Sequence, residues 1–175
     1  MTTVANRVQR SLRAIPDYPK PGILFQDITP VLRDGPLLRD VVADMCRPFR
    51  DRDVTHVMGI EARGFILGGA IAAALGAGFV PARKPGKLPW ELATESYDLE
   101  YGSDSLEAHR DALNHGNRVL VVDDVLATGG TAKAAGQLAR GLGAELVGWS
   151  FLLEIGSLAG RERLIGAHCH VIARC

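Results

Sequence analysis

Two kinds of segment alternate along the chain. One kind is a short apolar stretch of the length of a β-strand, and in the other kind small and apolar residues recur at helical spacing. The strand-like runs are THVMGI (55–60), GFVPARK (78–84), VLVVD (119–123) and AELVGWSFLLE (144–154), and the helical segments are GFILGGAIAAALG (64–76) and TAKAAGQLARGLG (131–143). Strand, helix and strand at this spacing are typical of a parallel sheet with helices on its faces. The pattern therefore predicts an α/β fold, a parallel twisted sheet flanked by helices.

The N-terminal part of the chain does not follow this alternation. Residues 3–14 have the pattern of a short amphipathic helix, and the connection PDYPKPGILFQDITP (16–30) that follows is too rich in proline for regular helix. A further helix is expected from Pro36 to about Phe49, with Pro48 ending or bending it.

The polar segment 85–110 interrupts the alternation a second time. It lies between two strands where a short connection would suffice, and its YDLEYG and SLEAH portions alternate as in a small hairpin. Long excursions of this kind are more often functional than decorative. We interpret it as a flap, with a surface hairpin as the alternative.

Composition places the chain among ordinary globular proteins. Its 175 residues fit one domain, and 47% hydrophobic and 23% charged residues are typical values. The 20 basic and 20 acidic residues cancel, so net charge gives no support for a nucleic-acid or membrane partner. No repeat or linker divides the sequence, and we expect residues 1–175 to form a single domain.

The cysteines and the N-terminus bear on location. Cys46, Cys169 and Cys175 have no paired spacing, and the N-terminus lacks the apolar core of a signal peptide, so a reducing cytoplasm is expected. His168 and His170 flank Cys169, but this triplet lacks the second ligand pair of a zinc site. It does not predict a metal centre.

The chemistry is concentrated in VLVVDDVLATGGT (119–131), where an apolar strand ends in Asp123 and Asp124. Ligands of open parallel sheets bind beyond the carboxyl ends of the strands. The ATGGT loop (127–131) leads into a helix, so its N–H groups suit a phosphate, while two acceptor-only carboxylates suit a sugar diol or a metal. Together they predict a site for a ribose 5-phosphate.

The motif also permits a simpler interpretation. Asp123 and Asp124 could cap the next helix with Gly-Gly as a simple turn. Dinucleotide and nucleoside triphosphate sites are not favoured, because no GxGxxG follows a strand and no GxxxxGK[ST] is present.

VLVVDDVLATGGT resembles the phosphoribosyl-pyrophosphate-binding signature of the type I phosphoribosyltransferases. Four further segments resemble the adenine-specific branch of that family, in its order: PDYPKPGILFQDITPVL, GIEARGFILG, RKPGKLP and ESYDLEYG. The resemblance covers nearly the whole chain. It implies the family fold, with residues 1–34 as a base-binding hood and 85–110 as a flexible flap.

The resemblance also implies roles for individual residues. Ribose and 5-phosphate binding is expected from Asp123, Asp124, Ala127, Thr128, Gly129, Gly130 and Thr131, pyrophosphate binding from Glu61, Ala62, Arg63, Arg83, Lys84 and Lys87, and adenine binding from Leu24, Phe25, Gln26 and Leu126. Glu100 and Arg63 are the expected catalytic residues, and Tyr101 closes with the flap. Many relatives have Asp-Ser where this chain has Glu61-Ala62, the bond at which the family commonly has a cis peptide.

The implied reaction is the Mg²⁺-dependent conversion of adenine and 5-phosphoribosyl 1-pyrophosphate to AMP and pyrophosphate. The substrates would hold most of the Mg²⁺, and no protein ligand set is assigned to it. The resemblance implies a homodimer without nucleic-acid or membrane partners. Two alternatives stay open: a phosphoribosyltransferase for another base, and a non-catalytic regulator that senses phosphoribosyl pyrophosphate.

Overall fold

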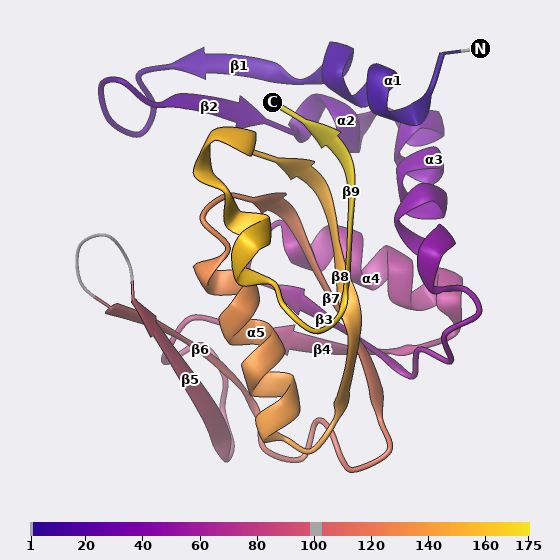
Figure 1. Ribbon diagram of the computed structural model, residues 1–175, viewed down its shortest axis with the longest axis vertical. Coiled ribbons are helices and arrows are strands. Elements are labelled where there is room, and N and C mark those ends of the chain that lie inside the picture. The colour runs from indigo at the N-terminus through magenta and orange to yellow at the C-terminus, as the bar shows by residue number, and fades with distance from the viewer. Residues whose placement is uncertain (1, 99–102) are drawn as a thin grey trace.

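The computed structural model describes residues 2–98 and 103–175 (Figure 1). The helices are α1 (Val4–Ser11), α2 (Thr29–Arg33), α3 (Gly35–Cys46), α4 (Gly64–Leu75) and α5 (Gly130–Gly141), with 3-10 turns η1 (Arg47–Phe49), η2 (Gly156–Leu158) and η3 (Gly160–Arg163). The strands are β1 (Arg13–Pro16), β2 (Leu24–Asp27), β3 (His56–Ile60), β4 (Gly78–Ala82), β5 (Leu92–Asp98), β6 (Ser103–His109), β7 (Arg118–Leu126), β8 (Glu145–Glu154) and β9 (His168–Arg174).

A five-stranded parallel sheet forms the centre of the molecule. Its order is β4-β3-β7-β8-β9, and each neighbouring pair is parallel. The predicted α/β fold is confirmed. Because all five strands run in the same direction, their carboxyl ends meet at one edge, where ligands of such sheets bind.

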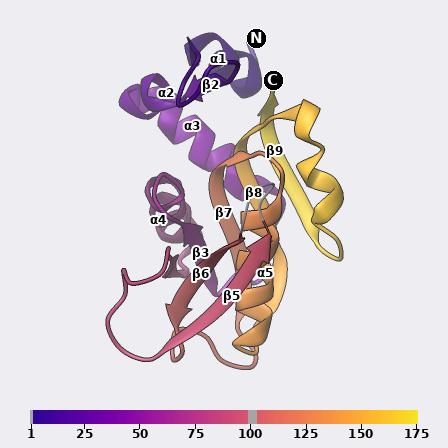
Figure 2. The same ribbon diagram turned by 90° about the vertical axis from the view of Figure 1, so that its left-hand side faces the viewer.

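Helices cover both faces of this sheet, as Figure 2 shows from the side. One apolar cluster joins α5 and strand β6 to one face, and another joins α1, α3 and α4 to the opposite face. Small residues bring α5 close to the sheet: a Cβ on Gly136 would lie 2.9 Å from the Leu146 side chain. The Trp149 indole is buried there and donates to the Ala132 carbonyl at 3.2 Å.

The first helix is shorter than the sequence pattern predicts. It ends at Ser11 rather than near residue 14, because Arg13–Pro16 forms β1 and pairs antiparallel with β2. Backbone pairing of residues 13–16 with β2 ends the helix early, and the periodicity of apolar residues within the helix cannot reveal that pairing. The Pro36 helix is confirmed as α3, and Pro48 lies in the 3-10 turn that follows it.

Two hairpins lie beside the sheet (Figure 1). The β1–β2 hairpin extends over the carboxyl edge of β7 and β8. The segment 85–110 contains the predicted hairpin, in which β5 and β6 pair antiparallel. Arg83 and Glu107 join this hairpin to the end of β4 through two backbone hydrogen bonds of 2.9 and 2.7 Å. In the described ranges, no helix combines the length and the hydropathy that crossing a membrane requires.

Candidate active site

A cavity of about 430 Å³ opens at the carboxyl edge of the sheet, beneath the β1–β2 hairpin. Three segments that are distant in sequence meet in it: β2, the loop after β3, and the end of β7. Its lining includes Leu24, Phe25, Gln26, Glu61, Ala62, Arg63, Lys84, Asp123, Asp124, Ala127 and Thr131. The structure therefore brings residues from all three expected subsites to one cavity.

Asp124 forms an ion pair with Arg63 across this cavity. The Asp124 side chain is almost fully buried, and Arg63 Nε lies 2.5 Å from its Oδ2. Burial is the largest influence and opposes the Arg63 charge, but the hydrogen bond to Asp124 and the charges of the nearby aspartates together outweigh it, so the pKa of Arg63 is raised. The same guanidinium lies 5.5 Å from the centre of the Phe25 ring. Arg63 thus links the loop after β3 to both β7 and the hairpin.

Within residues 2–98 and 103–175, Asp123 forms no ion pair, since the nearby Arg63 pairs with Asp124. Its Oδ1 accepts a hydrogen bond from the Asp124 N–H at 2.8 Å. Gly64 allows the start of α4 to pack against it, since a Cβ there would lie 2.8 Å from the same oxygen. Burial and the neighbouring Asp124 charge raise the pKa of Asp123 well above its usual value. A ligand that offered hydroxyl donors or positive charge would offset this penalty.

The segment Ala127–Thr131, which we call the glycine loop, connects β7 to α5. Four residues of the glycine loop line a smaller cavity of about 70 Å³, together with residues at the end of β7 that include Leu126. Gly129 has φ of +80°, and no side chain caps the first turn of α5. The N–H groups of that turn are the kind of donors that bind phosphate at helix N-termini.

Glu61 on the opposite side of the cavity is fully paired. Arg83 donates to both its carboxylate oxygens at 3.2 Å, and the Lys84 N–H donates to Oε2 at 3.0 Å. The Arg83 hydrogen bonds lower the pKa of Glu61. The peptide bond between Glu61 and Ala62 is cis.

The basic residues after β4 differ in their positions. Lys84 lines the cavity and its ammonium contacts Asp104 of β6. Arg83 is held by Glu61, and its Nη1 also donates to the Lys87 carbonyl at 3.1 Å. The structure does not bring the exposed Lys87 side chain to the cavity wall.

The residue expected to cover the second face of the base needs correction. Leu126 is only 1% exposed, packs in the apolar cluster beneath α5 and does not line the cavity that Phe25 lines. Its neighbour Val125 does line that cavity, together with Ile155, which directly follows β8. Position relative to the acidic pair did not distinguish 125 from 126, because the register of the strand end decides which side chain faces the core.

Five residues that the sequence did not predict line the cavity, and two predicted site residues lie outside the part of the chain that the structure describes. Ile23, Ile60, Tyr97, Val125 and Ile155 also line the cavity. Of these, only Val125 has a sequence signal, its position beside the acidic pair, and that signal does not separate it from Leu126. Glu100 and Tyr101, the expected flap residues, lie outside the described residues.

Comparison with known proteins decides the family. Residues 34–163, more than half of the chain, match the phosphoribosyl transferase domain family. The chain belongs to that family. The match includes the acidic pair and the glycine loop but begins after β2, so it leaves the β1–β2 hairpin of this phosphoribosyl transferase unmatched.

Full-length relatives include that hairpin. The adenine phosphoribosyltransferase of Myxococcus xanthus (strain DK1622) is 59% identical over 163 residues, which are 93% of this chain and 89% of the relative. The crystal structure of adenine phosphoribosyltransferase from Rhodothermus marinus DSM 4252 is 48% identical and superposes with a TM-score of 0.96 over 100% of both chains. The Saccharomyces cerevisiae enzyme, crystallised with adenine and an imino-altritol bisphosphate, is 38% identical with a TM-score of 0.91 over 98% of this chain and 99% of that one.

Proposed function

We infer that this chain is an adenine phosphoribosyltransferase, which converts adenine and 5-phosphoribosyl 1-pyrophosphate to AMP and pyrophosphate. One observation carries this inference: the β1–β2 hairpin places Phe25 over the same cavity that Asp123, Asp124 and the glycine loop line. Relatives that share both parts at up to 59% identity have this activity in their names.

For the phosphoribosyl group, we propose two contacts. The glycine loop binds the 5-phosphate with the free N–H groups at the start of α5. Asp123 and Asp124 accept hydrogen bonds from the ribose hydroxyls, which would relieve the electrostatic penalty that raises the pKa of Asp123. The anomeric carbon would then lie between the acidic pair and the hairpin.

At the reacting centre, a purine nitrogen forms a bond to the anomeric carbon while the bond from that carbon to pyrophosphate oxygen breaks, and the proton of that nitrogen is released to the leaving pyrophosphate or to water. Positive charge develops on the sugar and negative charge on the leaving group. Glu61, Ala62 and Arg63 supply the pyrophosphate loop, and the cations of Arg63 and Lys84 at the cavity wall, with those of Arg83 and Lys87 outside the wall, stabilise the departing charge. Arg63 is the one of these that also contacts Asp124 and Phe25.

The base occupies the end of the cavity between Phe25 and Val125. The Phe25 ring stacks on the purine, and the backbone groups of Leu24 and Gln26 read its edge. Val125 and Ile155 provide the opposite apolar wall. We further propose that residues 1–34 act as a hood over the base and 85–110 as a flap, in which Glu100 and Tyr101 close over the reacting centre and exclude water.

Mg²⁺ fits this cavity as a partner of the substrate. Among residues 2–98 and 103–175, no group of three or more His, Cys, Asp or Glu side chains is placed to hold a metal ion. Hard cations prefer oxygen ligands, which the diphosphate and ribose hydroxyls provide in number, with Asp123 and Asp124 adjacent. When bound, Mg²⁺ supplies charge neutralisation of the leaving pyrophosphate.

We propose a homodimer formed through α4 and the edge strand β4. Ile66 and Phe79 on these two elements are 50% and 39% exposed, large values for apolar side chains on neighbouring elements, and α4 is apolar on all sides. Light scattering should give twice the 18.7 kDa chain mass. We place the enzyme in the cytoplasm, in keeping with the free thiols of Cys46, Cys169 and Cys175.

The test is a base-by-base assay. The protein is incubated with Mg²⁺, phosphoribosyl pyrophosphate and adenine, hypoxanthine, guanine, xanthine or a pyrimidine, and nucleotide formation is followed by chromatography. AMP from adenine, with the other bases far slower, is the expected result. Turnover of guanine in preference to adenine would overturn the substrate, and absence of turnover with every base would leave a sensing role.

A further inference from the structure

Glu154 is a buried carboxylate that has no part in the reaction described above. It is the last residue of β8, is 4% exposed, and lies in register with Leu126 of β7 and Arg174 of β9. The cavity lining includes its neighbour Ile155 but not Glu154 itself. Its side chain instead meets two arginines outside the cavity.

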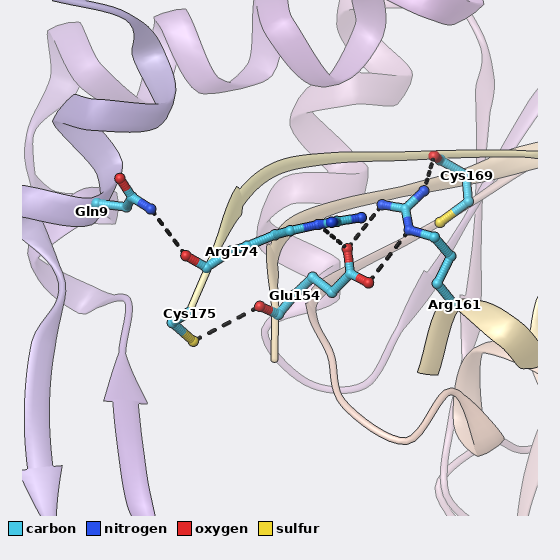
Figure 3. Close-up of polar contacts among 6 residues, drawn as sticks. All are labelled: Gln9, Glu154, Arg161, Cys169, Arg174 and Cys175. Atoms are coloured by element: carbon cyan, nitrogen blue, oxygen red, sulfur yellow. Dashed lines mark hydrogen bonds and ion pairs between the residues drawn. The ribbon is translucent and has the colours of Figure 1, made fainter. Parts of the chain in front are cut away.

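Arg161 binds both oxygens of this carboxylate with the Nε–Nη2 edge of its guanidinium, as Figure 3 shows. Nη2 donates to Glu154 Oε2 at 2.9 Å and Nε to Oε1 at 3.4 Å, while Nη1 donates to the Cys169 carbonyl at 2.8 Å. Arg174 approaches the same Oε2 at 2.9 Å from β9. Planar, two-point pairing of this kind fixes orientation as well as distance.

Arg161 follows a glycine that touches the glycine loop. Gly160 is buried at the start of η3, and a Cβ on it would lie 2.0 Å from the Ala127 carbonyl oxygen. In the other direction, a Cβ on Gly129 would lie 2.3 Å from the Gly160 carbonyl oxygen. The two backbones are therefore in direct contact with no side chain between them, so displacement of η3 must displace the glycine loop.

We propose that Glu154 is a positioning residue for the 5-phosphate of phosphoribosyl pyrophosphate, acting through Arg161 and Gly160 on the glycine loop. The proposal rests on the assignment of that loop to the 5-phosphate. Arg174 shares the carboxylate but leads to β9 and the chain end, where its carbonyl accepts from Gln9. The two arginines thus form a matched pair, of which only Arg161 leads to the loop.

The experiment uses ribose 5-phosphate and inorganic pyrophosphate as separate probes, each titrated calorimetrically into the full-length protein with Mg²⁺. Glu154→Gln keeps the shape of the side chain and removes its charge. We expect it to raise the Kd of ribose 5-phosphate by about five- to tenfold, the order expected for partial loss of a charged hydrogen bond. The Kd of pyrophosphate should stay within about twofold of the wild-type value, because the hydrogen bonds described for Arg63, Arg83 and Lys84 involve no residue of η3.

Two further variants separate the possible causes. Arg161→Lys, which keeps the charge but not the two-point pairing, should reproduce the effect, whereas Arg174→Ala should leave the ribose 5-phosphate Kd within about twofold. Hydrogen exchange should be faster at residues 127–131 in Glu154→Gln and unchanged in β3. Should Glu154→Gln fail to fold, Arg161→Lys carries the same comparison with Arg174→Ala.

Gly129→Ala tests the loop assignment independently. If Gly129→Ala leaves the ribose 5-phosphate Kd unchanged, the role of the loop itself is wrong. If Gly129→Ala weakens binding but Glu154→Gln and Arg161→Lys do not, the positioning role is overturned and the proposed function stands. Equal losses for both probes, or an Arg174→Ala effect as large as that of Arg161→Lys, would show that Glu154 supports the fold in general.

Discussion

The acidic residues on the two sides of the cavity have opposite environments. After β3, both carboxylate oxygens of Glu61 accept hydrogen bonds from Arg83, one of them also accepts from a backbone N–H, and the pKa of Glu61 is lowered. At the end of β7, Asp123 and Asp124 share a single Arg63, and the pKa of Asp123 is raised by burial and by its neighbour's charge. The carboxylate charge is thus balanced on the Glu61 side and only partly balanced at the end of β7.

This difference shows where a ligand must act. A carboxylate that is already paired gains little from a substrate, whereas a buried and partly unpaired one gains whatever donors the substrate brings. Under the proposed assignment, the β7 edge is thus the side on which binding energy is available for the ribose. The Glu61 side keeps its cations in place, ready for a negatively charged leaving group. Each of the following substitutions tests one part of this contrast.

The largest effect is expected at the end of β7, where Val125 lines the cavity and the next residue, Leu126, is buried in the core. Leu126→Ala removes a fully buried side chain and should lower the free energy of unfolding by about 3 kcal/mol, measured by urea denaturation. Val125→Ala should destabilise the protein less and raise the KM for adenine by about three- to tenfold through lost apolar contact. A larger adenine effect from Leu126→Ala than from Val125→Ala would restore Leu126 to the base site.

Asp124→Asn should produce the next largest effect. It removes a charged acceptor from the ribose and half of the ion pair with Arg63, so the Kd of phosphoribosyl pyrophosphate should rise about tenfold or more. Asp40→Asn, which breaks a surface ion pair with Arg7, is the matched control and should leave that Kd unchanged. Unaltered affinity in Asp124→Asn would show that the pair does not contact the sugar.

How much of this the sequence could predict depends on how local the feature is. The parallel sheet, the acidic pair and the glycine loop are encoded in contiguous segments such as 119–131, where one strand, one loop and one helix start suffice. The β1–β2 pairing, the contact of Arg63 with Phe25 and the burial of Leu126 depend on segments that meet only in the folded chain. The Gly160 contact with the glycine loop belongs to this second kind, because no pattern within 156–164 indicates it.

Asp123→Asn should have a smaller effect, on stability rather than on affinity alone. The folded-state pKa of Asp123 lies above the ordinary value of 3.8, so the folded protein binds more protons than the unfolded one between the two values. Stability contributed by the protonated form is therefore lost as pH rises through that window. At pH 7 the asparagine variant should melt about 2–4 °C higher, the shift that roughly 1 kcal/mol produces in a domain of this size.

The pH dependence of that difference is the sharper observation. The advantage of Asp123→Asn should shrink as pH falls towards 3.8 and vanish below it, where the wild-type carboxyl becomes protonated in both the folded and the unfolded state. Melting temperatures from pH 4 to pH 8, recorded by circular dichroism without substrate, test this. A variant that is less stable than wild type at pH 7 would show that the carboxylate is already compensated in the free enzyme.

The smallest effect, and the opposite sign, is expected for Glu61→Gln. Pairing with Arg83 lowers the pKa of Glu61 from 4.5, so its contribution is present above that value and is lost as pH falls through the folded-state pKa. Because both partners are partly exposed, the contribution is about 0.5 kcal/mol. Glu61→Gln should therefore melt slightly below wild type at pH 7 and converge with it below pH 4.5, measured in the same series as Asp123→Asn. If both substitutions shift the melting temperature in the same direction at pH 7, the two sides of the cavity do not differ as their charges indicate.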